Sequence, residues 1–266
     1  LHRQEAKVVC VAGNSIETPR LFLMSASSMF PNGLANSSDQ VGRNYMRHLT
    51  GSVYARFDKP VNFYRGETMA GFLADEVKNN PKRGFVGGYY LETLALGPSF
   101  MGAFLEPGGW GKKFADMMDG YRNLAGMWIV GEDMPQANNR ITLGSAKDAF
   151  GLPAPNVHFD DHPNDTAMRN HAYNVGEKIY KSVGAKQTWR TTPYPHTHNL
   201  GTMRMSAKKK DGVTNKWGRC HDIKNLFVSD GSVMTTGAAC NPTLTIVALA
   251  IRQGEYLADQ LKKGKI

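Results

Sequence analysis

A short apolar strand followed by a long amphipathic helix closes the sequence, and this pairing constrains the fold more than any other feature. The segment "KNLFVSDGS" (224–232) predicts a buried strand that ends in an acid and a glycine. The segment "NPTLTIVALAIRQGEYLADQLKK" (241–263) predicts an amphipathic helix, because apolar residues recur at three- and four-residue steps. Those residues are Leu244, Val247, Ala248, Ile251, Ala258 and Leu261. Together the two segments predict an α/β layer.

The beginning of the sequence has the same α/β character. The β-branched run "KVVCVAGN" (7–14) predicts a buried strand that includes Cys10. The segment "TPRLFLMSAS" (18–27) predicts a helix with Thr18 as its N-cap and Pro19 at its first position. Because domains rarely open on a central strand, we expect this sequence to be the later part of something longer.

Between these segments the pattern changes to that of an antiparallel sheet. Stretches such as "GSVYARF", "FVGGYYLETL", "LAGMWIVGE" and "NRITLGS" are separated by turns rich in Gly and Pro. Helical spacing runs over 165–185. The predicted fold class is therefore α/β plus α+β, in which one domain is interrupted by another. The α/β segments are 1–48 and 196–266, and the inserted antiparallel domain is 49–195.

The composition excludes several classes of protein. The chain has 266 residues, 41% of them hydrophobic, which is too apolar for a disordered protein. No apolar run approaches the ~20 residues that a membrane span needs. The formal net charge is +9, but the basic residues are scattered and the densest cluster (208–210) predicts a solvated loop, so no nucleic-acid partner is predicted. Three cysteines without a C-x-x-C pair predict neither a disulfide framework nor a metal site, and they leave the compartment open.

Two positions near the end of the sequence are candidates for ligand contacts. Asp230, followed by Gly231, ends a predicted strand, at the sheet edge where open α/β sheets bind ligands. Its carboxylate either accepts hydrogen bonds from ribose or ribityl hydroxyls or binds its own turn. Asn241 and Pro242 open the final helix. Asn241 either caps that helix or is left to bind a substrate oxygen while the helix start faces an anion or an electron-rich ring.

Histidines supply the other candidates. In "HTHNLGTMRM" (196–205), His198 is either a catalyst or a loop residue, and His196 has no motif of its own. No carboxylate or cysteine nearby completes a metal site. His221 and Asp222 resemble a fragment of a hydrolase triad, but no G-x-S-x-G elbow accompanies them. No G-x-G-x-x-G fingerprint opens a helix anywhere in the sequence.

Several of these segments match one family in chain order. The stretches "HNLGTMRM" and "NKWGRCHDIKNLFVSDGSVMTTGAACNPTLTIVALA" (215–250) resemble the C-terminal signature of the glucose–methanol–choline (GMC) oxidoreductases. Within that family the similarity is closest to sugar, gluconate and glucoside dehydrogenases and to pyranose oxidase. "VVCVAGNSIETPRLFLMSAS" (8–27) is similar to the family's Ala-Gly strand and Ser/Thr-Pro helix, and "VGRNYMRH" (41–48) to its V-G-x-N-x-x-x-H segment.

The resemblance implies a flavoprotein with a split, Rossmann-like FAD-binding domain and an inserted substrate domain. By position, it implies that His198 is the active-site histidine and Asn241 its paired residue. It places Asp230 and Gly231 at the ribityl–pyrophosphate part of FAD. The remaining implied cofactor contacts are the main chain of Asn241, Pro242 and Thr243 at the flavin ring, and Ala12, Gly13 and Asn14 at the adenosine side.

The reaction implied by the resemblance is oxidation of a CH–OH group in a sugar, polyol or other alcohol. His198 would accept the hydroxyl proton, flavin N5 the hydride, and Asn241 would orient the substrate oxygen. The family's G-x-G-x-x-G segment, which cradles the pyrophosphate, is absent from this sequence. We therefore expect an N-terminal half or a partner chain to supply it. An electron-acceptor protein is a further partner that the resemblance allows.

Two other classes of function stay open. One is a non-catalytic binding or assembly subunit that keeps the fold without FAD. The other is a hydrolase that uses His221 and Asp222. The substrate pocket is equally open, because strand aromatics either line a sugar site or belong to the core. The aromatic residues concerned are Tyr89, Tyr90, Trp110 and Trp128.

Overall fold

Five antiparallel strands form the larger sheet of the computed structural model, which describes residues 2–105, 107–193 and 197–266. Strands β2 (Leu49–Arg56) and β5 (Leu124–Gly131) pair along their whole length at its centre. This arrangement confirms the antiparallel strands predicted from "GSVYARF", "FVGGYYLETL" and "LAGMWIVGE". The sheet order is β3 (Phe72–Leu73), β4 (Tyr89–Thr93), β5, β2 and β8 (Gln187–Arg190).

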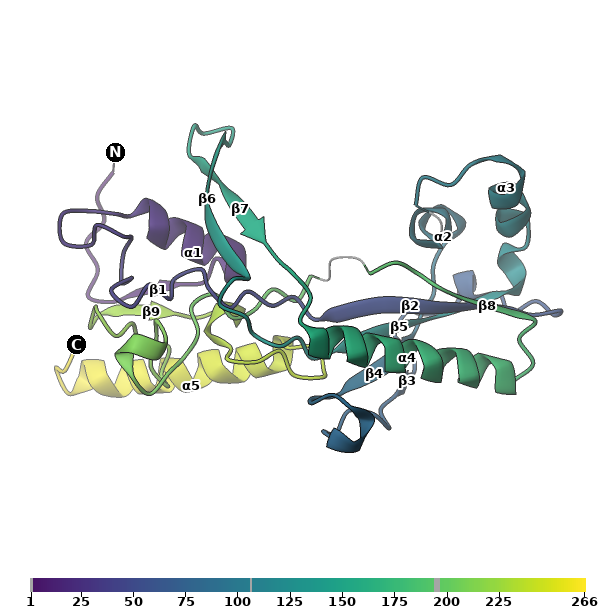
Figure 1. The fold of residues 1–266 in the computed structure, drawn as a ribbon. Coiled ribbons are helices and arrows are strands. Elements are labelled where there is room, and N and C mark those ends of the chain that lie inside the picture. The colour runs from purple at the N-terminus through teal and green to yellow at the C-terminus, as the bar shows by residue number, and fades with distance from the viewer. Residues whose placement is uncertain (1, 106, 194–196) are drawn as a thin grey trace.

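Helix α4 (Pro163–Ser182) lies across one face of this sheet and confirms the helix predicted over 165–185 (Figure 1). The apolar core between them includes Leu49, Val53, Leu91, Ile129, Met168 and Ala172. Helices α2 (Pro98–Leu105) and α3 (Gly111–Asp119) lie at the end of the sheet far from the two termini. In the part of the chain that the structure describes, no helix combines the length and apolarity needed to cross a membrane.

The predicted strand "NRITLGS" forms, but it stands apart from the five-stranded sheet. Strand β6 (Arg140–Lys147) pairs with β7 (Pro153–His158) in a separate hairpin that packs against helix α1 (Asn14–Met24) (Figure 1). Arg20 of α1 anchors the hairpin, because its Nε donates to Pro153 O at 2.8 Å and its guanidinium pairs with Asp148. Part of the 49–195 segment therefore lies against the 1–48 segment.

The two ends of the sequence meet in a parallel pair of strands. β1 (Val9–Val11) runs beside β9 (Leu226–Val228), with Val9 opposite Leu226. β9 is buried as predicted, but Val9 is 46% exposed and Cys10 is also exposed. The prediction of a buried strand at 7–14 is therefore wrong for the described chain. β1 has β9 on one edge, and no other described strand pairs with it.

Helix α1 begins at Asn14, five residues before its predicted first residue, Pro19. Gly13 precedes its first residue, and Pro19 lies inside the helix rather than at its first position. Proline has no N–H, so the carbonyl of Ser15 loses its normal helical donor. The hydroxyl of Thr202 replaces that donor and binds Ser15 O at 2.8 Å. The hydroxyl of a residue far along the chain thus compensates for the missing N–H of proline, so the helix can begin before Pro19. Thr18 does not act as the N-cap.

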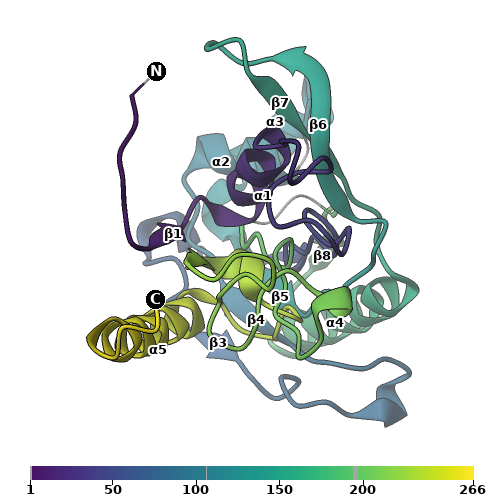
Figure 2. The same ribbon diagram turned by 90° about the vertical axis from the view of Figure 1, so that its left-hand side faces the viewer.

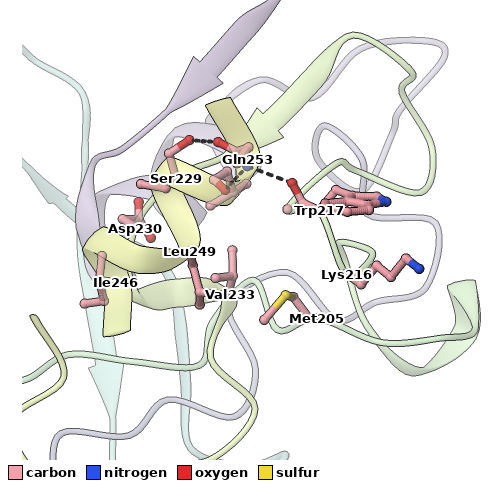
Figure 3. A pocket seen from close by; sticks show the side chains of 12 residues that line it. Met205, Lys216, Trp217, Ser229, Asp230, Val233, Ile246, Leu249 and Gln253 are labelled. Atoms are coloured by element: carbon pink, nitrogen blue, oxygen red, sulfur yellow. Dashed lines mark hydrogen bonds between the residues drawn. The ribbon is translucent and has the colours of Figure 1, made fainter. Parts of the chain in front are cut away.

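Helix α5 (Thr243–Lys262) is amphipathic, but its predicted apolar face points away from the described chain. Leu244 is 83% exposed, and Val247 and Ile251 are also exposed, whereas Gln253 is the helix's buried residue. The Gln253 side chain crosses to β9, where its amide donates to Trp217 O and Val228 O, both at 2.9 Å (Figure 3). Figure 2 shows α5 at the edge of the molecule, with the remaining chain on one side of it.

Candidate functional site

The imidazoles of His48 and His198 are hydrogen-bonded to each other beside the start of β2. Their Nδ1 atoms are 3.0 Å apart, and the rings meet edge to face with centroids 4.9 Å apart. On its other side, Nε2 of His48 lies 3.2 Å from the carbonyl oxygen of Gly237. The histidine predicted to be catalytic is thus held by a second histidine. His196 and the predicted domain boundary at 195 lie outside the described residues.

Burial keeps both imidazoles uncharged near neutral pH. It lowers the pKa of His48 to about 4, because the charged ring would lose its hydration. The same cause lowers the pKa of His198, whose side chain is half-buried. A neutral imidazole carries one N–H and one lone pair, so the pair joins a donor to an acceptor.

Three distant segments converge on His48. The buried Asp133, just after β5, accepts a hydrogen bond from the main-chain N of Arg47 at 2.7 Å. Burial raises the pKa of this carboxyl to about 7. Gly237 packs closely against this region, since a Cβ there would lie 3.1 Å from Asp133 N, which is tighter than most Cβ contacts. The segment 41–48 was recognised from sequence, but nothing local showed that His48 would meet His198.

Asp230 joins α1 to the turn that follows β9. Its Oδ2 accepts hydrogen bonds from Asn14 N at 3.1 Å and from the Thr18 hydroxyl at 2.6 Å. Its Oδ1 accepts from the main-chain N and the hydroxyl of Ser232 at 2.8 and 2.5 Å. The structure therefore brings together two segments predicted to bind the cofactor, and it also contains the turn bond that was the alternative. Contact between this carboxylate and FAD stays a prediction.

The other residues predicted to contact the cofactor near Asp230 lie at the same contact between α1 and the turn after β9. The N–H of Gly13 donates to the Thr18 hydroxyl at 2.9 Å, and Ala12 is exposed beside it. Gly231 is packed so closely that a Cβ would lie 2.9 Å from a methyl carbon of Leu200 and 3.0 Å from Asn199 O. This close approach places the turn after β9 directly against the residues that follow His198.

Asn241 does not cap α5. The N-cap position of this helix is taken by Pro242, and no side-chain cap bond forms there among the described residues. Instead, Oδ1 of Asn241 lies 2.9 Å from the hydroxyl of Tyr90, whose single proton it shares with Glu92 Oε1 at 2.8 Å. Tyr90 and Glu92 are buried on one face of β4, as their two-residue spacing requires. Sequence reasoning missed Glu92, although this spacing after Tyr90 was a usable signal.

The four aromatic residues considered for a sugar pocket have different environments. Tyr90 reaches Asn241, whereas Tyr89 is a core residue whose hydroxyl is 2.9 Å from His171 Nδ1. Trp128 packs on an apolar cluster under the sheet. Trp110 is 88% exposed before α3. A common wall formed by all four is therefore not present.

The geometry around His221 and Asp222 does not form a hydrolase triad. Ser206 Oγ lies 3.1 Å from His221 Nε2, but its own proton is donated to Lys208 O at 2.8 Å. The carboxylate of Asp222 binds Ser37, with Oγ at 2.7 Å, and Lys209. It is therefore committed to partners other than the histidine, and the serine is not activated as a nucleophile.

The space between β9 and α5 is too small for a cofactor ring. The cavity there measures about 20 Å³ and is lined by residues including Asp230, Val233, Leu249 and Gln253 (Figure 3). A volume of this size accommodates about one water molecule. A planar ring therefore does not fit between this part of α5 and β9.

Residues 135–250 match the family model described as GMC oxidoreductase. The 2-methyl-1,2-propanediol dehydrogenase of Mycolicibacterium austroafricanum is 38% identical, over 97% of this chain and 49% of its own length. The fructose dehydrogenase large subunit of Gluconobacter japonicus is 32% identical, over 99% of this chain and 49% of its own length. The chain thus spans about half the length of these curated relatives.

A solved structure shares the fold at low sequence identity. Formate oxidase of Aspergillus oryzae, studied for modification of its FAD, matches 96% of this chain and 55% of its own with a TM-score of 0.65 and 16% identity. The mixed α/β architecture is therefore that of GMC oxidoreductase structures. The family match and the sequence relatives show that this chain carries the GMC oxidoreductase family domain, over residues 135–250.

Proposed function

We propose that this chain carries the catalytic histidine and the flavin-facing helix of an FAD-dependent oxidoreductase that oxidises a CH–OH group. One observation carries the proposal: His198 is bonded to the buried His48, which in turn lies against Gly237. Gly237 is four residues from Asn241, so the predicted base and the start of α5 belong to one connected site. The substrates named for the two relatives, a diol and a sugar, are both alcohols.

In this proposal each residue has a defined task. FAD, when bound, supplies the acceptor for the hydride that leaves the carbinol carbon. His198 accepts the hydroxyl proton, so the alcohol loses one proton and one hydride and leaves as a carbonyl compound. Asn241, held by the Tyr90 hydroxyl, orients the substrate oxygen. The substrate itself is a sugar, a polyol or another alcohol.

The residues present suit the flavin end of FAD. The first turn of α5 has no side-chain cap within the described residues, and N–H groups at a helix start stabilise acceptor atoms and negative charge. Asn241, Pro242 and Thr243 would hold the ring there, and the Asn14–Asp230 joint would contact the rest of the cofactor. In this division, 1–48 and 196–266 belong to a split, Rossmann-like domain and 49–195 to the substrate domain.

A complementary half is needed to complete the site. The pyrophosphate-binding G-x-G-x-x-G segment is absent from the sequence. The exposed apolar face of α5, formed by Leu244, Val247 and Ile251, and the exposed strand β1 are surfaces that a soluble fold covers. We infer that the segment carrying the missing glycine-rich loop packs there, either within the same protein or as a partner chain.

Replacing His198 with alanine tests the proposal. The protein carrying FAD is mixed anaerobically with an alcohol substrate, and flavin reduction is followed by absorbance. Loss of the base should lower the reduction rate by ~10²–10⁴-fold. His171→Asn, on α4, alters a histidine that binds Tyr89 in the sheet core and should leave the rate unchanged. An unchanged rate in His198→Ala would remove His198 from this role.

A non-catalytic assembly subunit is the second candidate. The exposed apolar face of α5 is consistent with this candidate as well, because a helix face that only binds another chain does not require a cofactor. Absorbance of the protein purified with its natural partners separates the two. A flavin spectrum supports the enzyme, whereas a colourless complex supports the assembly subunit.

A further inference from the structure

We propose that His48 is a positioning residue that fixes the tautomer of His198. It accepts the Nδ1 proton of His198 and thereby leaves the lone pair of His198 on Nε2, where the substrate proton is received. This inference rests on the proposed role of His198 and names the atom that acts as base. It also assigns a task to His48, which the sequence motif left without one.

The tautomer follows from the contacts of His48 with Gly237 and His198. A carbonyl oxygen can only accept, so the contact with Gly237 O at 3.2 Å requires the proton of His48 on Nε2. A neutral ring has one N–H, and Nδ1 of His48 is therefore an acceptor. The proton between the two Nδ1 atoms, which are 3.0 Å apart, is therefore donated by His198. A neutral His198 with its proton on Nδ1 carries the lone pair on Nε2.

The surroundings of His48 favour this neutral state. Its side chain is 1% exposed, and burial lowers its pKa to about 4. A protonated His48 would present an N–H at Nδ1 and could no longer accept from His198, so the pair in this direction requires a neutral His48. The neutral acceptor is therefore the form that the site stabilises.

The backbone aims the His48 ring. The φ angle of His48 is +62°, a left-handed backbone conformation that residues other than glycine seldom adopt. The preceding Arg47 N–H is held by the buried Asp133, and this bond stabilises the turn into β2. Backbone strain of this kind persists where the surroundings impose it, and here it directs the imidazole between Gly237 and His198.

Two amide substitutions separate the two bonds of His48. The side-chain oxygen of asparagine can occupy the place of Nδ1, so His48→Asn keeps an acceptor for His198 but gives up the bond to Gly237. The longer glutamine amide reaches the place of Nε2, so His48→Gln keeps the bond to Gly237 but removes the acceptor. A purely structural role predicts that the buried bond to Gly237 matters most, and a positioning role predicts the opposite order.

The variants are compared as intact protein carrying FAD, with thermal unfolding and flavin content measured for each. We expect His48→Gln to lower the rate of flavin reduction by roughly 10- to 100-fold and His48→Asn by less than about threefold. His171→Asn serves as the matched control. Equal losses in both variants, or a larger loss in His48→Asn, would overturn the inference.

A spectroscopic measurement tests the tautomer without any activity. In protein labelled with ¹⁵N-histidine, the ¹⁵N resonances of His198 are assigned by their loss in His198→Ala. We expect the wild type and His48→Asn to carry the His198 proton on Nδ1, and His48→Gln to lose this preference. A wild-type proton on Nε2 overturns the inference. If instead His198→Ala reduces flavin normally while the proton sits on Nδ1, the proposed function fails and the tautomer assignment stands.

Discussion

Replacing Asp230 by asparagine tests the joint between α1 and the turn after β9. In the wild type, Oδ2 accepts from the main-chain N of Asn14, and Oδ1 accepts from that of Ser232. An asparagine amide has one oxygen and one NH₂ group. Whichever way it is turned, the NH₂ group therefore faces a main-chain N–H that cannot rotate away. The hydroxyls of Thr18 and Ser232 can rotate and adapt.

The expected loss of unfolding free energy follows from the number of N–H groups that lose an acceptor. One main-chain N–H, either the part-buried one of Asn14 or the buried one of Ser232, loses its acceptor, which costs about 1–3 kcal/mol. The remaining bonds also lose the strengthening that a charged acceptor provides, about 1 kcal/mol more. We expect Asp230→Asn to lower the free energy of unfolding by roughly 2–4 kcal/mol. Ser232→Ala removes one hydroxyl and leaves both N–H groups paired, so it should cost only about 1 kcal/mol.

Urea unfolding followed by tryptophan fluorescence measures the difference. With an m-value of about 2 kcal/mol per M, the midpoint should fall by roughly 1–2 M in Asp230→Asn and by about 0.5 M in Ser232→Ala. An Asp230→Asn midpoint equal to or above that of Ser232→Ala would refute the reasoning, because the amide would then satisfy both N–H groups.

Three further outcomes are expected. The pKa of His48 is about 4 in the folded protein, below its ordinary ~6.5, so the unfolded state binds more protons in this window and stability falls as the pH is lowered through it. Urea unfolding of His48→Asn should show a smaller fall, and an equal fall would contradict this. Tyr90→Phe frees Asn241 and should lower kcat/KM roughly fivefold, whereas an unchanged value would contradict a positioning role for the Tyr90 hydroxyl. Ile251→Asp should lower the FAD content of purified protein relative to Glu255→Gln on the same helix, and equal contents would argue against a covered α5 face.

Local periodicity was enough to predict most of the helices and strands. The strands at 49–56 and 124–131 are buried along nearly their whole length, and the helix at 163–182 buries one face, so their apolar runs and spacing are visible in the sequence. The start of α1 was wrong, because the Thr202 hydroxyl compensates for Pro19 from a distant segment. The contact of the β6–β7 hairpin with α1 was not predicted, since alternation in a strand does not specify which surface covers it.

Candidate residues within short motifs, such as His198 and Asp230, could be found from the sequence because turn, strand and helix signals surround them. The partners of these residues could not. His48 and Tyr90 lie far from His198 and Asn241 along the chain, and only the packing of the β2 and β4 sheet against the segments around β9 brings them together. The apolar stripe of α5 was likewise visible, but the direction it faces was not. Periodicity depends on neighbours a few residues away, whereas these contacts depend on which surfaces meet after the chain has folded.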